Sequence, residues 1–275
     1  MTKVSIIIPT TRETLPYCEL TVKSLRDSGC HWDIIAVLNG TNEHYPKQMA
    51  GARIVINRDK GQCNAVNIGA RLSAPDSEYF FISNDDMYYA PGWDKNLRFD
   101  HPVFSPNLLE PTTGPGSAPP FLTIDGGFTL DTFDKAIVDE AVDQHVNTKM
   151  QTRATTGFNF PVFIKADVWR TIGGYDTKYD PWGSNSDTDL QTKIELAGIQ
   201  PMRLRDVLVY HFSNKSGTFD GTHQAEWQKN WDYYTSKWGF NRDDEPKPDT
   251  WMATNMVNRE KNIYHPIWEG RYGQV

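Results

Sequence analysis

The sequence predicts an α/β fold, with a mostly parallel sheet flanked by helices and a helical extension at the C-terminal end. Strand-like and helix-like segments alternate over the first 100 residues, in the order strand, helix, strand, strand, helix, strand. This order is typical of a parallel sheet with helices on its faces. In such sheets ligands bind beyond the carboxyl ends of the strands, so the residues that follow each predicted strand are the first candidates for a site.

The predicted elements of the first half follow from their apolar patterns. Residues 4–8 form a β-branched run that is closed by Pro9, which is typical of a buried strand. The next apolar residues recur every three or four positions and predict a helix that ends near Gly29; they are Leu15, Cys18, Val22 and Leu25. The same criteria predict strands over residues 33–38, 53–56 and 79–83 and a helix over residues 63–72.

The second half alternates less regularly. Residues 102–120 are rich in Pro, Gly, Ser and Thr and predict a long loop, which in a compact domain is a mobile functional segment or a partly disordered one. As a lid, this loop would order over a bound ligand and exclude water. Strands are predicted over residues 160–166 and 207–212, a helix over residues 187–197, and another helix in the aromatic tail from Trp227. Burial against the domain is the expected role of this tail, with an acceptor surface or an oligomer contact as alternatives.

The composition is that of a globular protein with an acidic balance. The formal net charge is −7 over 275 residues. Proteins that bind nucleic acid mainly through its phosphates usually carry a basic face, so this charge argues against a nucleic-acid partner. It does not exclude a nucleotide that is held by a local site.

The cysteines and the apolar runs bear on the compartment. Cys18, Cys30 and Cys63 are odd in number and lack C-x-x-C spacing. They predict neither a disulfide framework nor a zinc site, and a cytoplasmic location is the simplest interpretation. Residues 4–8 are too short for the apolar core of a signal peptide, and no run approaches the roughly 18 apolar residues of a membrane span. Peripheral contact with a membrane stays open.

An acidic turn follows the predicted strand over residues 79–83. It consists of Asn84, Asp85 and Asp86. In one interpretation these residues cap the turn, where Asp is common. In the other, one carboxylate binds a divalent ion and its neighbour holds a ribose hydroxyl. Mn²⁺ or Mg²⁺ takes one or two carboxylates plus substrate phosphates, and such an ion would stabilise a diphosphate as a leaving group.

A second acidic pair, Asp187 and Asp189, starts the predicted helix over residues 187–197. One interpretation is structural, with Ser186 as the N-cap and both acids favourably placed near the positive end of the helix dipole. The functional interpretation makes Asp187 a general base that takes a proton from an acceptor hydroxyl. Asp189 cannot share that face of the helix and is interpreted as structural or as orienting its neighbour.

Three further side chains are candidates for the same crevice. His211 lies near the end of a predicted strand, where it is either a structural hydrogen-bonding residue or, as a neutral imidazole, a ligand that completes a Mn²⁺ site. Arg12 suits phosphate oxygens, although a surface arginine in a loop is common. Trp182 offers an apolar platform for a sugar ring or else packs in the core. No G-x-G-x-x-G follows the first strand and no Walker A sequence is present, so a dinucleotide site is not supported.

Six segments in collinear order over residues 3–217 resemble the inverting glycosyltransferases of family 2, which have the GT-A fold. In the first half these are residues 4–10 (VSIIIPT), 33–40 (DIIAVLNG), 59–61 with 67–70 (DKG and NIGA), and 81–87 (FISNDDM) with 91–93 (PGW). The last of them is similar to the DXD-type metal motif of that family. In the second half, residues 173–176 (GGYD) with 186–190 (SDTDL) resemble the segment of the catalytic base, and Tyr210, His211 and Ser216 resemble a late metal-binding histidine block.

The resemblance implies a metal-dependent hexosyltransferase that moves a sugar from a nucleotide-diphosphate sugar to a hydroxyl of a glycan, a lipid-linked sugar or a small molecule. It implies Mn²⁺ or Mg²⁺ on Asp86 and His211, and Asp187 as the base. The residues expected to contact the nucleotide-sugar are Pro9, Thr10, Arg12, Asn39, Asp59, Gly61, Asn67, Asn84 and Asp85. Trp182 and Gly183 are expected on the acceptor side.

Three positions depart from the family pattern. Leu38 replaces an acid that often contacts the nucleotide base, which leaves the base open between uracil, thymine and guanine. Ser186 stands where a Glu usually precedes the catalytic Asp, so Asp187 is the best base. The metal motif begins with Asn84, so the pair of acids after it is expected to do the work.

The predicted organisation is a GT-A domain over residues 1–217 and a helical extension over 218–275. Within the domain, residues 1–100 form the donor half and residues 101–217 the acceptor and catalytic half. Two other functions remain open. One is a non-catalytic protein on the same fold that binds a nucleotide-sugar or a glycan. The other is a sugar nucleotidyltransferase, which would be expected to show a glycine-rich and basic loop after the first strand, where this chain has Thr-Thr-Arg-Glu.

Overall fold

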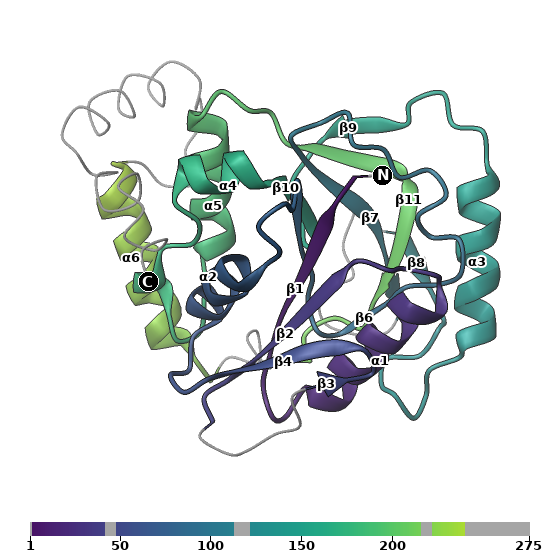
Figure 1. The fold of residues 1–275 in the computed structure, drawn as a ribbon, viewed down its shortest axis with the longest axis horizontal. Coiled ribbons are helices and arrows are strands. Elements are labelled where there is room, and N and C mark those ends of the chain that lie inside the picture. The colour runs from purple at the N-terminus through teal and green to yellow at the C-terminus, as the bar shows by residue number, and fades with distance from the viewer. Residues whose placement is uncertain (1, 42–47, 113–121, 216–221, 240–275) are drawn as a thin grey trace.

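The computed structural model describes residues 2–41, 48–112, 122–215 and 222–239. Figure 1 shows a central sheet with helices on both sides of it. The first half contains β1 (Val4–Thr10), α1 (Leu15–Asp27), β2 (Asp33–Asn39), β3 (Gln48–Met49), β4 (Ala52–Asn57), α2 (Gln62–Leu72), β5 (Tyr79–Ile82) and β6 (Met87–Tyr88). The second half contains β7 (Val103–Pro111), β8 (Leu122–Ile124), α3 (Lys135–Asn147), β9 (Ala154–Thr156), β10 (Val162–Lys165), α4 (Ala166–Ile172), a 3-10 turn (Thr177–Tyr179), α5 (Ser186–Leu196), β11 (Met202–His211) and α6 (Gln224–Trp238).

The described strands form one sheet in the order β3-β4-β2-β1-β5-β10-β7-β11-β6, with β8 beside β7 and β9 beside β11. The strands β4, β2, β1 and β5 run parallel to one another, as the alternating sequence pattern predicts. Every strand and helix predicted for the first 100 residues is present. The first strand continues through Pro9 to Thr10, because a proline removes only one hydrogen-bond donor and its backbone angle is tolerated near a strand end. Because β1, β2 and β5 are parallel, their carboxyl ends lie at the same edge of the sheet.

The second half of the sheet is mixed. β10 is antiparallel to both β5 and β7, whereas β11 is parallel to β7. The predicted strands over residues 160–166 and 207–212 correspond to β10 and β11, although β11 begins earlier, at Met202. The antiparallel β10 joins the two halves into a continuous surface, so the end of β11 reaches the same region as the end of β5.

The prediction of a loop over residues 102–120 was wrong for its first half. Residues 103–111 form β7, and all nine of its residues are buried. The Pro- and Gly-rich composition is concentrated after residue 110, whereas the buried polar residues of β7 concealed its strand character in the sequence. One of them, Ser105, donates a hydrogen bond to the carbonyl oxygen of Asn159 at 2.7 Å. Residues 113–120 of the predicted lid lie outside the described residues.

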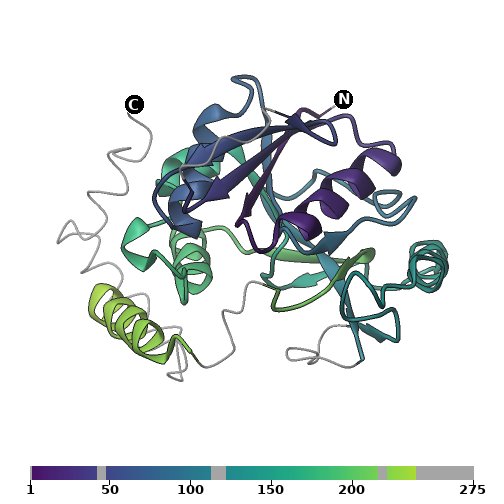
Figure 2. The same ribbon diagram turned by 90° about the horizontal axis from the view of Figure 1, so that it is seen from below.

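The aromatic tail packs against the domain, as expected. Tyr234 and Trp238 of α6 are buried among residues of α5 and β10. Figures 1 and 2 both place α6 and α3 at opposite ends of the molecule. The remainder of the predicted extension, residues 240–275, lies outside the described residues.

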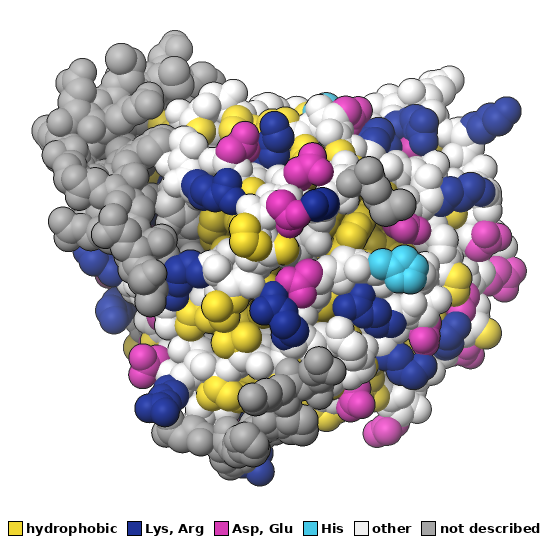
Figure 3. Space-filling model, in the orientation of Figure 1, with side chains coloured by type: hydrophobic (Ala, Val, Ile, Leu, Met, Phe, Trp, Pro, Cys, Tyr) yellow, Lys and Arg dark blue, Asp and Glu magenta, His cyan; other side chains and the backbone are white. Residues whose placement is uncertain are grey.

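The cysteines and the helices of the described residues bear on two further features of the sequence. Cys18, Cys30 and Cys63 are buried free thiols. None of the helices in the described ranges has the length and apolar run that a membrane span requires. On the face seen in Figure 3, acidic and basic side chains are interspersed rather than separated by sign.

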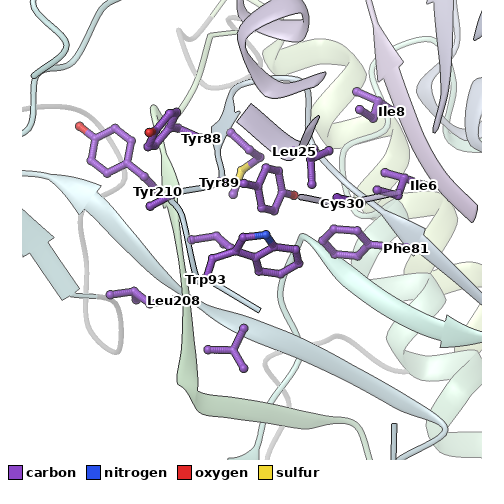
Figure 4. Packing of buried hydrophobic residues seen from close by; sticks show 14 of the residues in the cluster. Ile6, Ile8, Leu25, Cys30, Phe81, Tyr88, Tyr89, Trp93, Leu208 and Tyr210 are labelled. Carbon is purple, nitrogen blue, oxygen red and sulfur yellow. The ribbon is translucent and has the colours of Figure 1, made fainter. Parts of the chain in front are cut away.

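The core next to the acidic turn is aromatic. Phe163 of β10 stacks on Phe81 of β5 at 3.9 Å between ring centroids and on Phe104 of β7 at 4.7 Å. Figure 4 shows Tyr89 and Trp93 beside Phe81, and the Trp93 ring lies 6.0 Å from the Phe81 ring. Because these rings are fully buried and interlocked, the turn between β5 and β6 is held from both sides.

The helix α2 packs closely on β1 through Gly69. A Cβ atom at Gly69 would lie 2.4 Å from Cγ2 of Ile7. We expect Gly69→Ala to lower the stability by about 1–3 kcal/mol, because overpacking outweighs the better helix propensity of alanine. Thermal unfolding measures this effect, with Leu72→Ala as the control at an exposed position of the same helix. A midpoint at or above that of the wild type would contradict the close packing.

Candidate active site

A cavity of about 420 Å³ opens at the edge where the strands end. Most of the predicted site residues line it: Pro9, Thr10, Asn39, Asn84, Asp85, Asp86, Trp182, Gly183, Asp187 and His211. They come from the ends of β1, β2 and β11, from the turn after β5, and from the start of α5 and the segment before it. Side chains that are separated by up to two hundred positions in the sequence thus face one space.

The Asp85 carboxylate lies beside the hydroxyl groups of two threonines. Thr10 and Thr14 both hydrogen-bond to its carboxylate, and their own hydroxyls lie 3.3 Å apart. The hydroxyl of Thr21 fixes the backbone of the turn by donating to the carbonyl oxygens of Asp85 and Met87, each at 2.7 Å. Burial, together with the adjacent Asp86 charge, raises the pKa of Asp85 to about 7. The sequence did not reveal the part of Thr14, which sits just before α1.

Asp86, in the turn after β5, and His211, at the end of β11, face each other. Oδ1 of Asp86 lies 3.3 Å from Nε2 of His211, and Nδ1 of His211 lies 2.9 Å from Oε1 of Glu110. Burial alone would raise the pKa of Asp86, but His211 outweighs it, so this pKa lies below its usual range. Burial lowers the pKa of His211, but Asp86 and Glu110 together raise it to about 10.

These residues fit a divalent cation that the substrate helps to hold. Glu110 engages Nδ1 of His211 and leaves Nε2 directed at Asp86, which is the arrangement that usually supports a metal-binding histidine. Within the described ranges, no group of three His, Cys, Asp or Glu side chains is placed to hold an ion by itself. Mn²⁺ and Mg²⁺ commonly take one or two protein ligands and complete their shell with phosphate oxygens and water. Asp86 and His211 suit that mode of binding, in which the cation would take the place of the Nε2 proton of His211.

Asp187 lies on another wall of the cavity, in the first turn of α5. The helix begins at Ser186, and its N-cap is Asn185 in a left-handed conformation (φ 62°), so Ser186 is not the cap that the structural interpretation assumed. The Asp187 side chain lines the cavity and is exposed to it. Burial within these walls raises the pKa of Asp187 to about 6, against the opposing effect of a 3.0 Å hydrogen bond from the Tyr175 hydroxyl. A carboxylate in this state is reachable by a substrate and basic enough to accept its proton.

Asp189 faces the protein interior, as predicted. It is fully buried and accepts hydrogen bonds from Tyr179 Oη at 3.2 Å and from Trp238 Nε1 at 2.8 Å. It also forms ion pairs with Lys193 at 3.4 Å and with Lys237 at 2.7 Å. The two acids of this pair therefore have separate surroundings, one in the cavity and the other in the core.

Four residues expected to contact the donor do not line the cavity: Arg12, Asp59, Gly61 and Asn67. Asn67 instead holds the backbone of Tyr175 through two hydrogen bonds of 2.9 Å. Gly61 leaves room for Asp180, whose carboxylate would lie 2.5 Å from a Cβ atom at that position. Asp180 caps α2 by accepting from the backbone amides of Cys63 and Asn64 at 2.9 and 3.0 Å. Two of the four residues thus serve the contact between the two halves of the domain.

Trp182 contributes to the cavity wall, with both faces of its ring covered. His223 stacks on it with ring centroids 3.5 Å apart, and Lys60 Nζ lies 3.6 Å from the ring centroid. Two groups at these distances cannot share one face, so each takes its own. A sugar ring would have to displace Lys60 or His223 before it could stack on Trp182. Trp227, which follows the predicted boundary at 217, also lines the cavity.

Comparisons with known proteins show the fold of the chain and a family match for its first 98 residues. Residues 5–98 match the model of glycosyl transferase family 2, a segment that spans β1 to β6. The crystal structure of S. aureus TarS 1–349 is 12% identical with a TM-score of 0.52, and the alignment covers 99% of this chain and 92% of that chain. The structure of GalNAc-T7 with UDP, GalNAc and Mn²⁺ is 13% identical with a TM-score of 0.54, covering 96% of this chain and 57% of that chain.

No curated protein matches the chain by sequence. At such low identities the two solved structures speak for the fold alone, while the family match rests on the strands and turns that carry Thr10, Asn39, Asp85 and Asp86. The sequence resemblance stated above is thereby confirmed. Residues 5–98 are thus a segment of glycosyl transferase family 2, and the chain has the GT-A fold of the glycosyltransferase structures that it is similar to.

Proposed function

We propose that the protein transfers a sugar from a nucleotide-diphosphate sugar to a hydroxyl of a carbohydrate or glycoconjugate acceptor, with inversion at the anomeric carbon. The observation that carries this proposal is the position of Asp187 in the same cavity as Asp86 and His211. A single displacement requires a base and a site for the leaving group, and the candidates for both line one cavity. We assign the donor to residues 1–100 and the acceptor and base to residues 101–217.

The reaction exchanges one bond at the anomeric carbon and moves one proton. The acceptor oxygen attacks the anomeric carbon, the bond from that carbon to the diphosphate oxygen breaks, and the acceptor proton passes to the Asp187 carboxylate. The pKa of Asp187, raised by burial to about 6, leaves this group charged at neutral pH yet more basic than an ordinary carboxylate.

The strand ends orient the donor. Asn39 is fixed by a 2.8 Å hydrogen bond from Asn57 to its Oδ1, so its amide group is held at the cavity wall. Asp85 lies beside Thr10, and we assign a ribose hydroxyl of the donor to it. Asp86 and His211 would hold Mn²⁺ or Mg²⁺, which when bound supplies positive charge to the leaving diphosphate. Leu38 is fully buried and contributes no contact to a nucleotide base.

The test is a panel of UDP-, GDP- and dTDP-sugars, each with Mn²⁺ or with EDTA, read by release of nucleoside diphosphate and by thermal shift. We expect one nucleotide class to stabilise the protein by a few degrees at saturating concentration, and metal to be required for turnover. Asp86→Ala should abolish both responses. The exposed Asp76→Ala serves as the matched control and should retain them.

Two outcomes would overturn the proposal in different ways. If a nucleotide-sugar binds without any turnover in the presence of acceptors, the non-catalytic binding function replaces it. If no nucleotide-sugar binds with either metal, the donor site itself is wrongly assigned.

A further inference from the structure

We propose that Tyr175 is a positioning residue, whose hydroxyl holds one oxygen of the Asp187 carboxylate and so presents the other oxygen to the acceptor. This inference rests on the proposed function, because it concerns the group assigned as the base. Tyr175 is the third residue of the GGYD segment, and no part of the sequence argument gave it a role.

The geometry supports an orienting contact. Tyr175 Oη donates to Oδ1 of Asp187 at 3.0 Å, and the Tyr175 side chain is only 1% exposed. A carboxylate at the start of a helix is otherwise free to rotate about χ1 and χ2, and one fixed oxygen restricts both angles. The acceptor proton needs only the second oxygen, so the hydrogen bond does not compete with the reaction.

Tyr175 is itself rigidly held. Asn67 on α2 accepts from its backbone amide and donates to its carbonyl, both at 2.9 Å. The Tyr175 ring packs edge-on against Trp169 at 5.9 Å and lies parallel to Phe160 at 6.3 Å. The preceding Gly174 has no space for a side chain, since a Cβ atom would lie 2.6 Å from Oδ1 of Asn67. A group this constrained can fix the position of another.

The electrostatic surroundings are consistent with a permanent donor. Burial and the Asp187 charge raise the pKa of Tyr175 well above its usual value, so its hydroxyl keeps the proton over the working pH range. The other titratable groups that interact with this pair are Cys63 of α2 and Asp189 of α5. Asp85, Asp86 and His211 line the same cavity from the strand ends.

The chain provides a matched control four residues further on. Tyr179 Oη donates to Oδ1 of Asp189 at 3.2 Å, and Tyr179 is fully buried. Both tyrosines come from the same segment and donate to an acid in the first turn of α5. Only Asp187 lines the cavity, so a structural role predicts similar behaviour for the two Tyr→Phe variants, whereas a positioning role separates them.

The experiment measures kcat and KM of the full-length Tyr175→Phe and Tyr179→Phe variants from about pH 5 to about pH 9, with thermal unfolding in parallel. For Tyr175→Phe we expect kcat to fall about tenfold, KM to stay within about twofold, and the acid limb of the kcat profile to move up by about one pH unit. For Tyr179→Phe we expect a lower unfolding temperature and an unchanged acid limb.

A carboxyl ¹³C titration of Asp187, assigned with Asp187→Asn, follows the same bond without turnover. Its midpoint should rise in Tyr175→Phe and stay in place in Tyr179→Phe. An unmoved midpoint in Tyr175→Phe, or equal movement in both variants, would overturn the positioning role. If the wild type turns over no donor while the midpoint still rises, the hydrogen bond stands and it is the proposed transfer reaction that fails.

Discussion

Asp187→Asn is expected to lower turnover about a thousandfold while donor binding survives. Asparagine keeps the shape of the side chain, and its amide oxygen can still accept from Tyr175, but it cannot take the acceptor proton. Loss of a positioned general base commonly costs between about a hundredfold and ten thousandfold. The measurement is kcat for transfer, together with a thermal shift by donor and Mn²⁺ that should match the wild type.

The pH dependence of the wild-type kcat is a second test of Asp187. Burial raises the pKa of Asp187 to about 6, and the base acts only when deprotonated. The rate should therefore be full above this pH and fall tenfold per unit below it. Asp167→Asn is the control, since Asp167 is an exposed acid in the first turn of α4. If the Asp187→Asn variant keeps more than about a tenth of the wild-type kcat, another group accepts the proton.

Lys237→Met is expected to cost the largest amount of stability, about 3–5 kcal/mol, because it removes the nearest cation from two buried carboxylates. Lys237 is 5% exposed and contacts Asp176 at 2.8 Å and Asp189 at 2.7 Å. Lys193 is the other lysine of the cluster, and burial lowers its pKa, so it is a poor substitute. Thermal unfolding should show a midpoint lower by roughly 10 °C.

The exposed Lys229 on the same helix gives the control, Lys229→Met, which should unfold like the wild type. The sign of the pH dependence follows from Asp176. Burial would raise its pKa, but Lys237 holds it below the usual value, so the stabilisation is present above about pH 4 and is lost as the pH falls. The deficit of Lys237→Met should shrink on acidification. A constant deficit would point to lost packing by the lysine stem rather than to charge.

The first half of the fold was predictable because its periodicity is local. Buried β-branched runs and apolar residues at helical spacing are visible within a few positions, and each predicted strand there exists. β7 was missed because it buries Ser105, Asn107 and Glu110, and the polar pattern of a strand is then mistaken for a loop. The partners that make such burial tolerable, such as His211 for Glu110, lie a hundred positions away. Short-range patterns do not contain that information.

The site was predictable to the extent that its residues belong to motifs. Asp86, Asp187 and His211 do line one cavity, which the rule about strand ends anticipated for the first of them. Asn67 and Gly61 were assigned to the donor from a family resemblance, whereas the structure uses both in packing α2 against residues 174–180. A motif identifies residues that matter to a fold without saying whether they contact a ligand or another part of the chain.

The contacts of α2 restrict how such a domain can be recombined. This helix belongs to the donor half by sequence, yet Asn67 holds Tyr175 and the helix amides hold Asp180. A chimera joined near residue 100, with its second half taken from a relative, would place a foreign segment on these hydrogen-bond partners. Activity should survive such an exchange only if α2 travels with the incoming half. The part of the chain that must be exchanged together with the base therefore has two pieces. One is α2, which begins at residue 62, and the other is the second half of the domain.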